Sequence, residues 1–250
     1  MTIYGLIGKS LSHSFSQKYF TAKFEKEQIN AAYHLFEIAD IQDFVFLKEK
    51  YPSLKGLNVT IPYKKEIMPF LDEISAEAVA VGAVNTLSFL PNGNTKGYNT
   101  DIYGFYESIL AFIPIEMQEI PINALILGTG GASLAVEYVF KTYFPKWKYH
   151  FVSRFSQAEN VFLYTDLAKK DLSNFSIIIN TTPLGMYPNT TTFPDIPYYQ
   201  LSENHYIMDL VYNPLETVFL QKSKAQKANS YNGLKMLHIQ AEKAYEIWRM

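Results

Sequence analysis

Short apolar runs alternate with amphipathic stretches over the first part of the chain. Apolar runs that end at a glycine, a proline or a polar residue predict strands over residues 3–7, 33–38, 54–61 and 84–89. Apolar side chains at helical spacing predict helices over residues 14–24, 41–47 and 76–81. Because strands alternate with helices, this part is predicted to form an α/β layer structure.

The alternation starts again at Asn123. Strands are predicted over residues 124–127, 149–152, 176–179 and 206–208, and a helix is predicted over 133–143. This order is typical of a second βαβ series. An amphipathic helix over 102–112 and a proline-containing connection over 113–121 lie between the two series, and a last helix is predicted over 235–248.

The composition is that of a folded protein and excludes several classes. The chain has 250 residues, of which 48% are hydrophobic and 18% charged, so one large domain or two smaller ones can bury a sizeable core. With 22 Lys and Arg against 24 Asp and Glu, the net charge of −2 provides no field that would gather nucleic acid or an anionic membrane. The absence of cysteine excludes disulfides, Cys-ligated metals and a thiol nucleophile.

The sequence also bears on location. No basic region precedes an apolar run at the N-terminus, and no apolar stretch approaches the roughly 18 residues of a spanning helix. We therefore expect a cytoplasmic protein with no secretory signal and no membrane partner.

A glycine-rich turn follows the first strand of the second series and opens its helix. The turn consists of Gly128, Thr129, Gly130, Gly131 and Ala132, followed by Ser133. Backbone N–H groups at such a helix start favour a pyrophosphate, and glycines let it approach the chain closely. Ser133 stands where the G-x-G-x-x-G/A pattern has its third small residue, so a plain βα turn is the alternative. The strand before the turn and the helix after it favour nucleotide binding.

The end of the next strand bears on which nucleotide binds. An NAD site usually has an acidic residue there, which binds the ribose 2′-hydroxyl. Here the strand ends in Val152, Ser153 and Arg154, with no acid. A guanidinium suits a 2′-phosphate through its charge and its fork of donors, so NADP is favoured. The alternative is that Arg154 is a solvated loop arginine.

Several polar residues of the first series lie where strands end or helices begin. They are Ser14, Ser16, Asn58, Thr60, Lys64, Asn85, Asn99, Thr100 and Asp101. Ligands of α/β sheets bind outside the carboxyl ends of the strands, so these groups could converge on a small polar ligand. Each also has a purely structural interpretation: the serines and Asp101 are good N-cap residues, Lys64 could be a surface lysine and Asn85 a turn residue.

Other catalytic motifs fail on spacing. Gly8, Lys9 and Ser10 would need a glycine at position 3 to complete a P-loop, and that residue is Ile3. The five histidines form no HExxH or i,i+4 pair, so no metal site is predicted. No G-x-S-x-G elbow is present.

Nine short motifs occur in one order between residues 5 and 241. They are Gly5-Leu-Ile-Gly-Lys, His13-Ser14-Phe15-Ser16, Asn58-Val-Thr60-Ile-Pro62-Tyr-Lys64, Gly82-Ala-Val-Asn85-Thr86, Asn99-Thr100-Asp101, Gly128-Thr-Gly130-Gly131-Ala132-Ser133, Asn180-Thr-Thr-Pro183-Leu-Gly185-Met186, Asp209-Leu-Val-Tyr212-Asn-Pro214-Leu-Glu-Thr, and Gly233-Leu-Lys-Met236-Leu-His-Ile-Gln240-Ala. In these motifs the chain resembles the shikimate dehydrogenases, NADP-linked enzymes that reduce 3-dehydroshikimate to shikimate.

The resemblance implies an α/β fold with two domains, an α/β substrate-binding domain and a Rossmann-like NADP-binding domain, with a cleft between them. The substrate-binding domain would comprise residues 1–101, completed by a C-terminal helix over 235–250. The NADP-binding domain would comprise residues 102–234.

The implied reaction is the reversible, NADPH-dependent reduction of 3-dehydroshikimate to shikimate. This reaction belongs to the shikimate pathway, which leads to chorismate and the aromatic amino acids. The partners would be NADP and this small-molecule substrate, bound by a monomer or a homodimer, with no nucleic acid and no membrane.

The resemblance also implies roles for the matched residues. Lys64 and Asp101 would form the catalytic pair, and Ser14 and Ser16 would hold the substrate carboxylate. The rest of the substrate would be bound by Thr60, Asn85, Asp101, Tyr212 and Gln240. The cofactor would be bound by Gly128, Thr129, Gly130, Gly131, Ala132, Ser153, Arg154, Val211 and Gly233. An ammonium beside a carboxylate can stabilise and protonate the alkoxide that forms as the carbonyl is reduced.

Two positions depart from the family's pattern. The family often reads Asn-Arg-Thr at the 2′-phosphate loop, with a second basic residue four positions after the arginine. This chain has Ser153-Arg154-Phe155 there, and Ala158 at the later position. It also has Gln17 where proline is common, with no functional consequence expected, because proline is optional at a helix start.

Three alternatives stay open on the sequence. A quinate/shikimate dehydrogenase that prefers NAD is the nearest, and Arg154 argues against it. A catalytically silent nucleotide-binding regulatory relative would be favoured if Lys64 or Asp101 were missing, and both are present. A methyltransferase would usually have an acid at the end of the second strand, where Ser153 and Arg154 stand.

Overall fold

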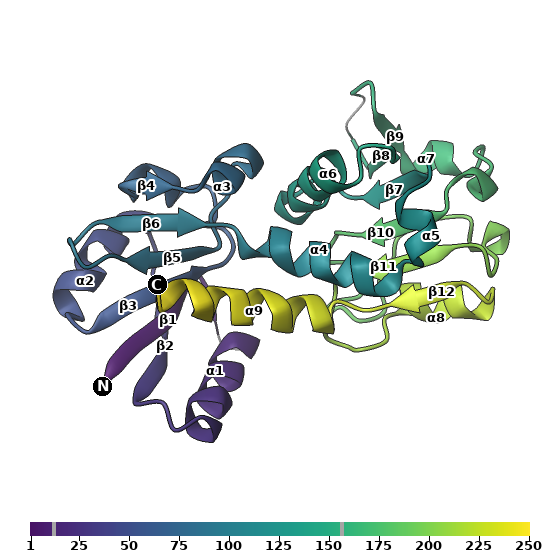
Figure 1. The fold of residues 1–250 in the computed structure, drawn as a ribbon. Coiled ribbons are helices and arrows are strands. Elements are labelled where there is room, and N and C mark those ends of the chain that lie inside the picture. Colours follow the sequence, from purple (N-terminus) through teal and green to yellow (C-terminus); the bar gives the residue numbers. More distant parts are fainter. Residues whose placement is uncertain (12–13, 156–157) are drawn as a thin grey trace. The chain divides into compact units, whose positions relative to one another are not determined.

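The computed structural model describes residues 1–11, 14–155 and 158–250 of the chain. The chain divides into two compact units, both drawn in Figure 1. The first unit comprises Met1–Thr100 and Gln240–Met250, and the second comprises Asp101–Ile239. The chain leaves the first unit at the start of α4 (Thr100–Phe112) and re-enters it within α9 (Leu234–Trp248).

The first unit is built on a mixed six-stranded sheet with the order β2-β1-β3-β5-β6-β4. β1 is parallel to β2 and β3, whereas β5 is antiparallel to both β3 and β6. The strands are β1 (Thr2–Gly8), β2 (Ala31–Glu37), β3 (Leu54–Val59), β4 (Glu73–Ile74), β5 (Thr86–Phe89) and β6 (Thr95–Tyr98). The helices are α1 (Phe15–Lys26), α2 (Leu47–Lys50) and α3 (Ala76–Val81), with 3-10 helices at Ile41–Phe46 and Met68–Phe70.

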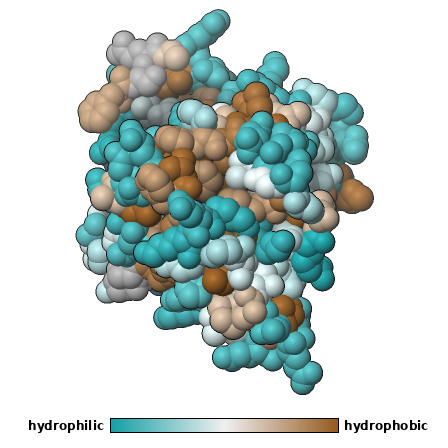
Figure 2. All heavy atoms as spheres, turned by 90° about the vertical axis from the view of Figure 1, so that its left-hand side faces the viewer, coloured by the Kyte–Doolittle hydropathy of each residue, from teal (hydrophilic) through white to brown (hydrophobic). Residues whose placement is uncertain are grey.

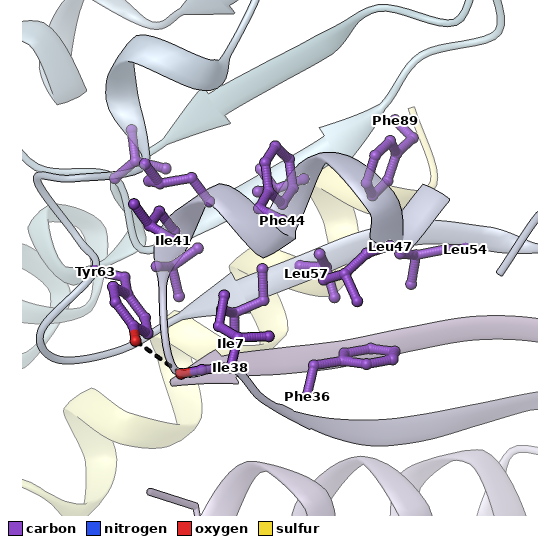
Figure 3. Close-up of a cluster of buried hydrophobic side chains, with 14 of the residues drawn as sticks. Ile7, Phe36, Ile38, Ile41, Phe44, Leu47, Leu54, Leu57, Tyr63 and Phe89 are labelled. Carbon is purple, nitrogen blue, oxygen red and sulfur yellow. Dashed lines mark hydrogen bonds between the residues drawn. The ribbon is translucent and has the colours of Figure 1, made fainter. Parts of the chain in front are cut away.

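Successive residues of β1 pack on opposite faces of this sheet, because side chains alternate along a strand. On one face, Ile7 of β1 and Leu57 of β3 belong to a buried cluster that also includes side chains of the 3-10 helix Ile41–Phe46. Figure 3 shows this cluster, in which the Tyr63 hydroxyl donates to the carbonyl oxygen of Ile38 at 2.7 Å. This contact anchors the segment that continues into Lys64.

On the other face, Tyr4 of β1 belongs to a second buried cluster, formed with α1 and the C-terminal part of α9. Trp248 of α9 stacks on Tyr4 with ring centroids 4.8 Å apart, and its indole N–H donates to the carbonyl oxygen of Leu87 at 2.9 Å. Tyr19 of α1 donates to Glu242 of α9. The end of the chain is therefore an integral layer of the first unit.

The second unit has a six-stranded sheet with the order β12-β11-β10-β7-β8-β9, in which every neighbouring pair is parallel. The strands are β7 (Asn123–Leu127), β8 (Lys148–Ser153), β9 (Val161–Leu163), β10 (Ile177–Asn180), β11 (Tyr206–Asp209) and β12 (Asn229–Tyr231). The helices are α4, α5 (Ile115–Gln118), α6 (Gly131–Tyr143), α7 (Tyr164–Leu167), α8 (Val218–Ala225) and the first part of α9, with 3-10 helices at Leu172–Asn174 and Tyr198–Gln200.

This strand order determines where a ligand can bind. Counted from β7, the order is the doubly wound one, in which a dinucleotide lies in the crevice where the strand order reverses. That reversal falls between β7 and β10, at the carboxyl ends of the strands. Fully buried residues of the central strands, among them Leu125 and Ile178, form the core below this edge.

The predicted α/β class and the Rossmann-like sheet are confirmed. The helix predicted over residues 41–47 is present as a 3-10 helix, Ile41–Phe46, that continues into α2. Asp40 accepts from the backbone N–H of Gln42 at 2.9 Å and from that of Asp43 at 3.1 Å, which closes a tight first turn. The connection predicted over 113–121 contains the single-turn helix α5.

Among the described residues, no helix is both long enough and apolar enough to cross a bilayer. On the face in Figure 2, hydrophobic residues form small groups separated by hydrophilic ones. Scattered exposed apolar side chains are normal for a folded protein and require no special explanation.

Candidate functional site

The polar residues of the first unit gather at one edge of its sheet. β1 and β3 are parallel, so the residues after both strands, including Thr60, lie at the same edge. β5 runs the other way, and its first residue, Thr86, pairs with Asn58 of β3 and with Tyr98 of β6. Asn85, before β5, and Thr100, after β6, therefore also lie at this edge.

A buried hydrogen-bond network joins these residues. The amide oxygen of Asn85 accepts from the backbone N–H of Thr100 at 2.7 Å, and the hydroxyls of Thr86 and Thr100 each lie 3.2 Å from it. The amide nitrogen of Asn58 donates to the Thr86 hydroxyl at 3.1 Å. Asn58, Asn85, Thr86 and Thr100 are all buried, so each hydrogen bond spares a polar group the cost of burial without a partner.

Gln240 reaches this network from the C-terminal helix. The Thr100 hydroxyl donates to its Oε1 at 3.3 Å, or to Asn85 Oδ1, since a hydroxyl has one proton. The network thus connects three residues that were identified separately in the sequence: Asn85, Thr100 and Gln240.

Ser14 and Ser16 occupy the start of α1. Ser14 is the N-cap residue, and its hydroxyl accepts from the backbone N–H of Gln17 at 3.4 Å. The Ser16 side chain interacts with Tyr33 of β2, and the Tyr33 hydroxyl donates to the amide oxygen of Asn58 at 2.8 Å. Burial raises the pKa of Tyr33, so its hydroxyl stays protonated. Ser16 is therefore connected to the network around Asn85. His13, from the same motif, lies outside the described residues.

Thr60 and Lys64 lie on the segment that follows β3. The backbone N–H of Thr60 donates to the carbonyl oxygen of Ile7 at 3.0 Å, which keeps the segment against β1. The carbonyl oxygen of Lys64 accepts from the backbone N–H of Val84 at 2.7 Å, and the Lys64 side chain is half-buried. Lys64 is thus held beside the Gly82–Asn85 turn rather than on a free surface loop.

The glycine turn of the second unit begins at Gly128, directly after β7. Gly128 has a φ of 107°, which favours glycine, and a Cβ there would lie 2.8 Å from Thr182 and 2.9 Å from Thr181. Its backbone N–H donates to the carbonyl oxygen of Val152 at 2.8 Å. The turn is therefore packed against the end of β8 and against the segment that follows β10.

Beyond Gly128 the turn is open. Gly130 is the N-cap of the 13-residue helix α6 and makes no side-chain cap hydrogen bond. A Cβ at Gly130 or at Gly131 would meet no atom within 4 Å, and both glycines are exposed along with Thr129. The packing of the protein itself therefore does not require glycine at these two positions. The open space leaves room for a ligand against the N–H groups at the helix start. These residues fit a pyrophosphate.

Ser133 explains the departure from the glycine pattern. It is fully buried in the first turn of α6, and its hydroxyl donates to the carbonyl oxygen of Gly130 at 2.6 Å. The third position of the pattern serves close helix packing, and a serine that bonds back to the turn meets that need. The imperfect motif therefore folds as a complete one does.

Ser153 is the last residue of β8, the strand next to β7, and Arg154 follows it. The Ser153 hydroxyl accepts from the backbone N–H of Phe155 at 3.3 Å, and the Arg154 guanidinium lies 5.2 Å from the centre of the Phe155 ring. Arg154 is exposed. A positive charge is thus available at the carboxyl edge of the sheet, beside the strand that carries the glycine turn.

Val211 and Gly233 approach each other through their backbones. The N–H of Gly233 donates to the carbonyl oxygen of Val211 at 3.1 Å, and a Cβ at Gly233 would overlap the carbonyl of Leu210. Tyr212 follows Val211 and is half-buried, which raises the pKa of its hydroxyl. These residues follow β11 and β12, at the same edge as the glycine turn.

Lys64 belongs to the first unit, and Asp101, in the first turn of α4, begins the second. Their pairing remains a prediction. The sequence analysis placed Asn58 and Thr100 among the polar residues that could converge on a ligand, but it gave no individual role to Tyr33, Asn58, Thr86 or Thr100. Asn58, Thr86 and Thr100 stand in the quoted motifs, whereas Tyr33 carried no signal, because it reads as an ordinary strand residue.

Known proteins resemble this chain over almost its full length. A family model described as the shikimate dehydrogenase substrate binding domain matches residues 6–87. The shikimate dehydrogenase (NADP(+)) of Methanococcus maripaludis is 38% identical over 98% of this chain and 90% of its own. The enzyme of the same name from Clostridium beijerinckii is 39% identical over 100% of this chain and 92% of its own.

Solved structures show the same likeness. Shikimate 5-dehydrogenase from Thermus thermophilus, in complex with NADP(H) and shikimate, is 28% identical with a TM-score of 0.82 and covers 99% of this chain and 93% of its own. Quinate dehydrogenase from Corynebacterium glutamicum, in complex with NAD, is 25% identical with a TM-score of 0.86 and covers 99% of this chain and 93% of its own.

Proposed function

Because this chain belongs to the shikimate dehydrogenase family, we propose that it catalyses the reversible, NADPH-dependent reduction of 3-dehydroshikimate to shikimate. The observation that carries the proposal is 38% identity to a shikimate dehydrogenase (NADP(+)) over 98% of the chain. The reaction belongs to the shikimate pathway. Lys64 and Asp101 are both present, which argues for an active enzyme rather than a silent relative.

The edge of the first sheet supports binding of the substrate there. Ser14 and Ser16 begin a helix, where hydroxyls, backbone N–H groups and the helix dipole all favour a carboxylate. The amide oxygen of Asn85 is occupied by donors from Thr86 and Thr100, which orients its amide nitrogen as the donor for a substrate hydroxyl. Thr60, Tyr212 and Gln240 would complete the contacts to the substrate.

Lys64 would carry the proton. As the ring carbonyl is reduced, its oxygen gains negative charge and needs a proton, and the Lys64 ammonium can stabilise that charge and donate. The Asp101 carboxylate would keep Lys64 charged and directed at this oxygen, and would accept a hydrogen bond from a neighbouring substrate hydroxyl. In the reverse reaction the same lysine would accept the proton.

The second unit would bind the cofactor. NADPH, when bound, supplies the hydride. The open glycines and the start of α6 would hold its pyrophosphate, and Ser153 and Arg154 its 2′-phosphate. Val211 and Gly233 would hold the nicotinamide end, with Gly233 allowing the close approach of two backbone segments.

A second candidate is oxidation of quinate with NAD. The likeness to the quinate dehydrogenase of Corynebacterium glutamicum favours it, and the exposed guanidinium of Arg154 argues against it.

The enzyme would work on a free small molecule in the cytoplasm, as a monomer or a homodimer.

One assay tests the proposal. Purified protein is mixed with shikimate or quinate, each with NADP or NAD, and reduction of the nicotinamide is followed by absorbance. We expect the highest kcat/KM for shikimate with NADP. Turnover of quinate with NAD, and none of shikimate with NADP, would contradict it.

A further inference from the structure

A carboxylate without solvent exposure lies at the end of β11, outside the set of residues assigned to the site. Asp209 is fully buried and receives three hydrogen bonds. One carboxylate oxygen accepts from the Asn180 amide at 2.9 Å and from the backbone N–H of Val211 at 3.0 Å, and the other accepts from the Thr217 hydroxyl at 2.6 Å. Burying a charge is costly, so an ionisable group kept here calls for a specific role.

The contact with Val211 leads to the nicotinamide end of the proposed cofactor site. Asp209 holds the N–H of Val211, and the carbonyl oxygen of Val211 accepts from the N–H of Gly233 at 3.1 Å. A Cβ at Gly233 would overlap Leu210, so this backbone crossing is tight. Asp209 therefore determines how the segment after β11 lies against Gly233.

The contact with Asn180 leads to the phosphate end. With its amide nitrogen held by Asp209, the amide oxygen of Asn180 accepts from the hydroxyl of Thr182 at 2.6 Å and from its backbone N–H at 3.0 Å. Thr182 packs against Gly128, where a Cβ would lie 2.8 Å from its methyl group. Asp209 therefore also supports the first residue of the glycine turn.

The third contact fixes the start of α8. Thr217 is the N-cap of this helix, and its hydroxyl accepts from the backbone N–H of Leu220 at 3.3 Å while it donates to Asp209. The loop between β11 and α8 is thus held by the carboxylate at both of its ends, at Val211 and at Thr217.

The three contacts lie at the carboxyl ends of β10 and β11, and β10 borders the point where the strand order of this sheet reverses, between β7 and β10. We propose that Asp209 is a positioning residue for NADP binding, which fixes the glycine turn and the Val211–Gly233 crossing relative to each other. This proposal rests on the proposed function for the identity of the cofactor. Asp209 acts through Val211 and Asn180 rather than as a catalytic group.

The test compares cofactor binding with substrate binding. Asp209→Ala removes the acceptor of all three donors, and Asp209→Asn keeps the shape but replaces one acceptor oxygen by a donor. The Kd for NADP, from direct titration without substrate, should rise by about tenfold in Asp209→Ala and by less in Asp209→Asn. The KM for shikimate at saturating NADP should stay within about twofold of the wild-type value, a split that general unfolding would not produce.

Asp171→Ala is the matched control. Asp171 also accepts a backbone N–H, that of Ser173 at 3.0 Å, but it is exposed and lies before β10 rather than after a strand. This variant should bind NADP as the wild type does. An Asp209→Ala protein with wild-type melting behaviour and a Kd for NADP within twofold of wild type would overturn the proposal.

If Asp209→Ala does not fold, Thr217 decides the question. Thr217→Val removes one donor to the carboxylate, whereas Thr217→Ser keeps the hydroxyl. Weaker NADP binding in Thr217→Val with rescue in Thr217→Ser supports the proposal, and equal binding in both overturns it. Because titration requires no turnover, a wild-type protein that binds NADP without oxidising shikimate would overturn only the proposed reaction.

Discussion

The Thr100 hydroxyl donates to Oε1 of Gln240 at 3.3 Å, although 140 residues separate the two. Thr100 is the last residue of the first stretch of the first unit, and Gln240 is the residue at which the chain returns to that unit. The same hydroxyl lies 3.2 Å from Oδ1 of Asn85. One side chain thus connects the start of α4, the sheet edge and the C-terminal helix.

Thr100→Val should weaken shikimate binding. The valine keeps the shape but removes the one hydroxyl proton that Thr100 can donate to Gln240 Oε1 or to Asn85 Oδ1, at a cost of about 1–3 kcal/mol in stability. We expect the KM for shikimate to rise several-fold and the Kd for NADP to stay unchanged. Thr2→Val is the control, because Thr2 is the first residue of β1 and lies at the end of the strand away from this network. It should alter neither the KM for shikimate nor the Kd for NADP. An unchanged KM in Thr100→Val would mean that the network supports the fold alone.

Lys64 and Asp101 should act as one catalytic unit. Lys64→Ala should lower kcat by about 10²- to 10⁴-fold, the usual range for a lost general acid/base, with a much smaller change in the KM for shikimate. Asp101→Ala should lower kcat and also raise KM, because the carboxylate also accepts a substrate hydroxyl.

The double variant separates coupled from independent action. If each residue works through the other, the double variant loses less than the product of the two single losses. Losses that multiply would show independent roles. A Lys64→Ala enzyme with near-normal kcat at saturating shikimate would remove Lys64 from the chemistry.

Arg154 should set the cofactor preference. Arg154→Ala removes a charge-assisted contact to the 2′-phosphate, typically about 1.5–3 kcal/mol, so NADP affinity should fall roughly 10- to 100-fold. Use of NAD should barely change. Equal losses with both cofactors, measured as kcat/KM, would show that Arg154 acts on structure instead.

Ser14 and Ser16 should serve the substrate carboxylate. Ser14→Ala and Ser16→Ala should raise the KM for shikimate and leave NADP affinity alone. Tyr33→Phe keeps the ring, which stacks on Phe20 at 4.7 Å, and removes the hydroxyl that Ser16 contacts, so it should raise the same KM by a smaller factor. A serine variant that loses only thermal stability, with unchanged kinetics, would identify that serine as a helix cap.

Asp209 should make the stability of the protein depend on pH. Burial raises the pKa of Asp209 from 3.8 to about 6. Between these values the folded protein holds a proton that the unfolded chain has released, so the free energy of unfolding falls as the pH rises from about 4 to about 6. The loss should be on the order of 2–3 kcal/mol.

Asp209→Asn has no such titration. Urea titrations at several pH values give the unfolding free energy of this variant and of the wild type. Between pH about 4 and about 6, the wild type should lose on the order of 2–3 kcal/mol that the variant does not lose. If the unfolding free energies of the two proteins changed with pH in parallel, Asp209 would not titrate between pH about 4 and about 6.

Local patterns in the sequence were enough to predict much of this protein. The alternation of strands and helices identified both α/β units, and the glycine turn was recognisable because its strand, turn and helix are consecutive in the chain. Elements with weak local patterns were missed: β6 contains Lys96 and Gly97, and β9 and β12 have only three residues each. Such strands are stabilised by their neighbours in the sheet rather than by their own composition.

Only the tertiary structure decided which polar groups meet. The local sequence does not show what Tyr33 and Asp209 contact: Tyr33 reads as a strand residue, and Asp209, although it opens a quoted motif, reads as the end of a strand. Their partners, Ser16 and Asn58 for the first, Asn180 and Thr217 for the second, come from other elements. A buried polar group must find its partner across the fold, and sheet order and register, which bring distant residues together, are not encoded in any short segment. The sequence by itself therefore determined the chemistry available at the site, and the fold decided what holds that chemistry in place.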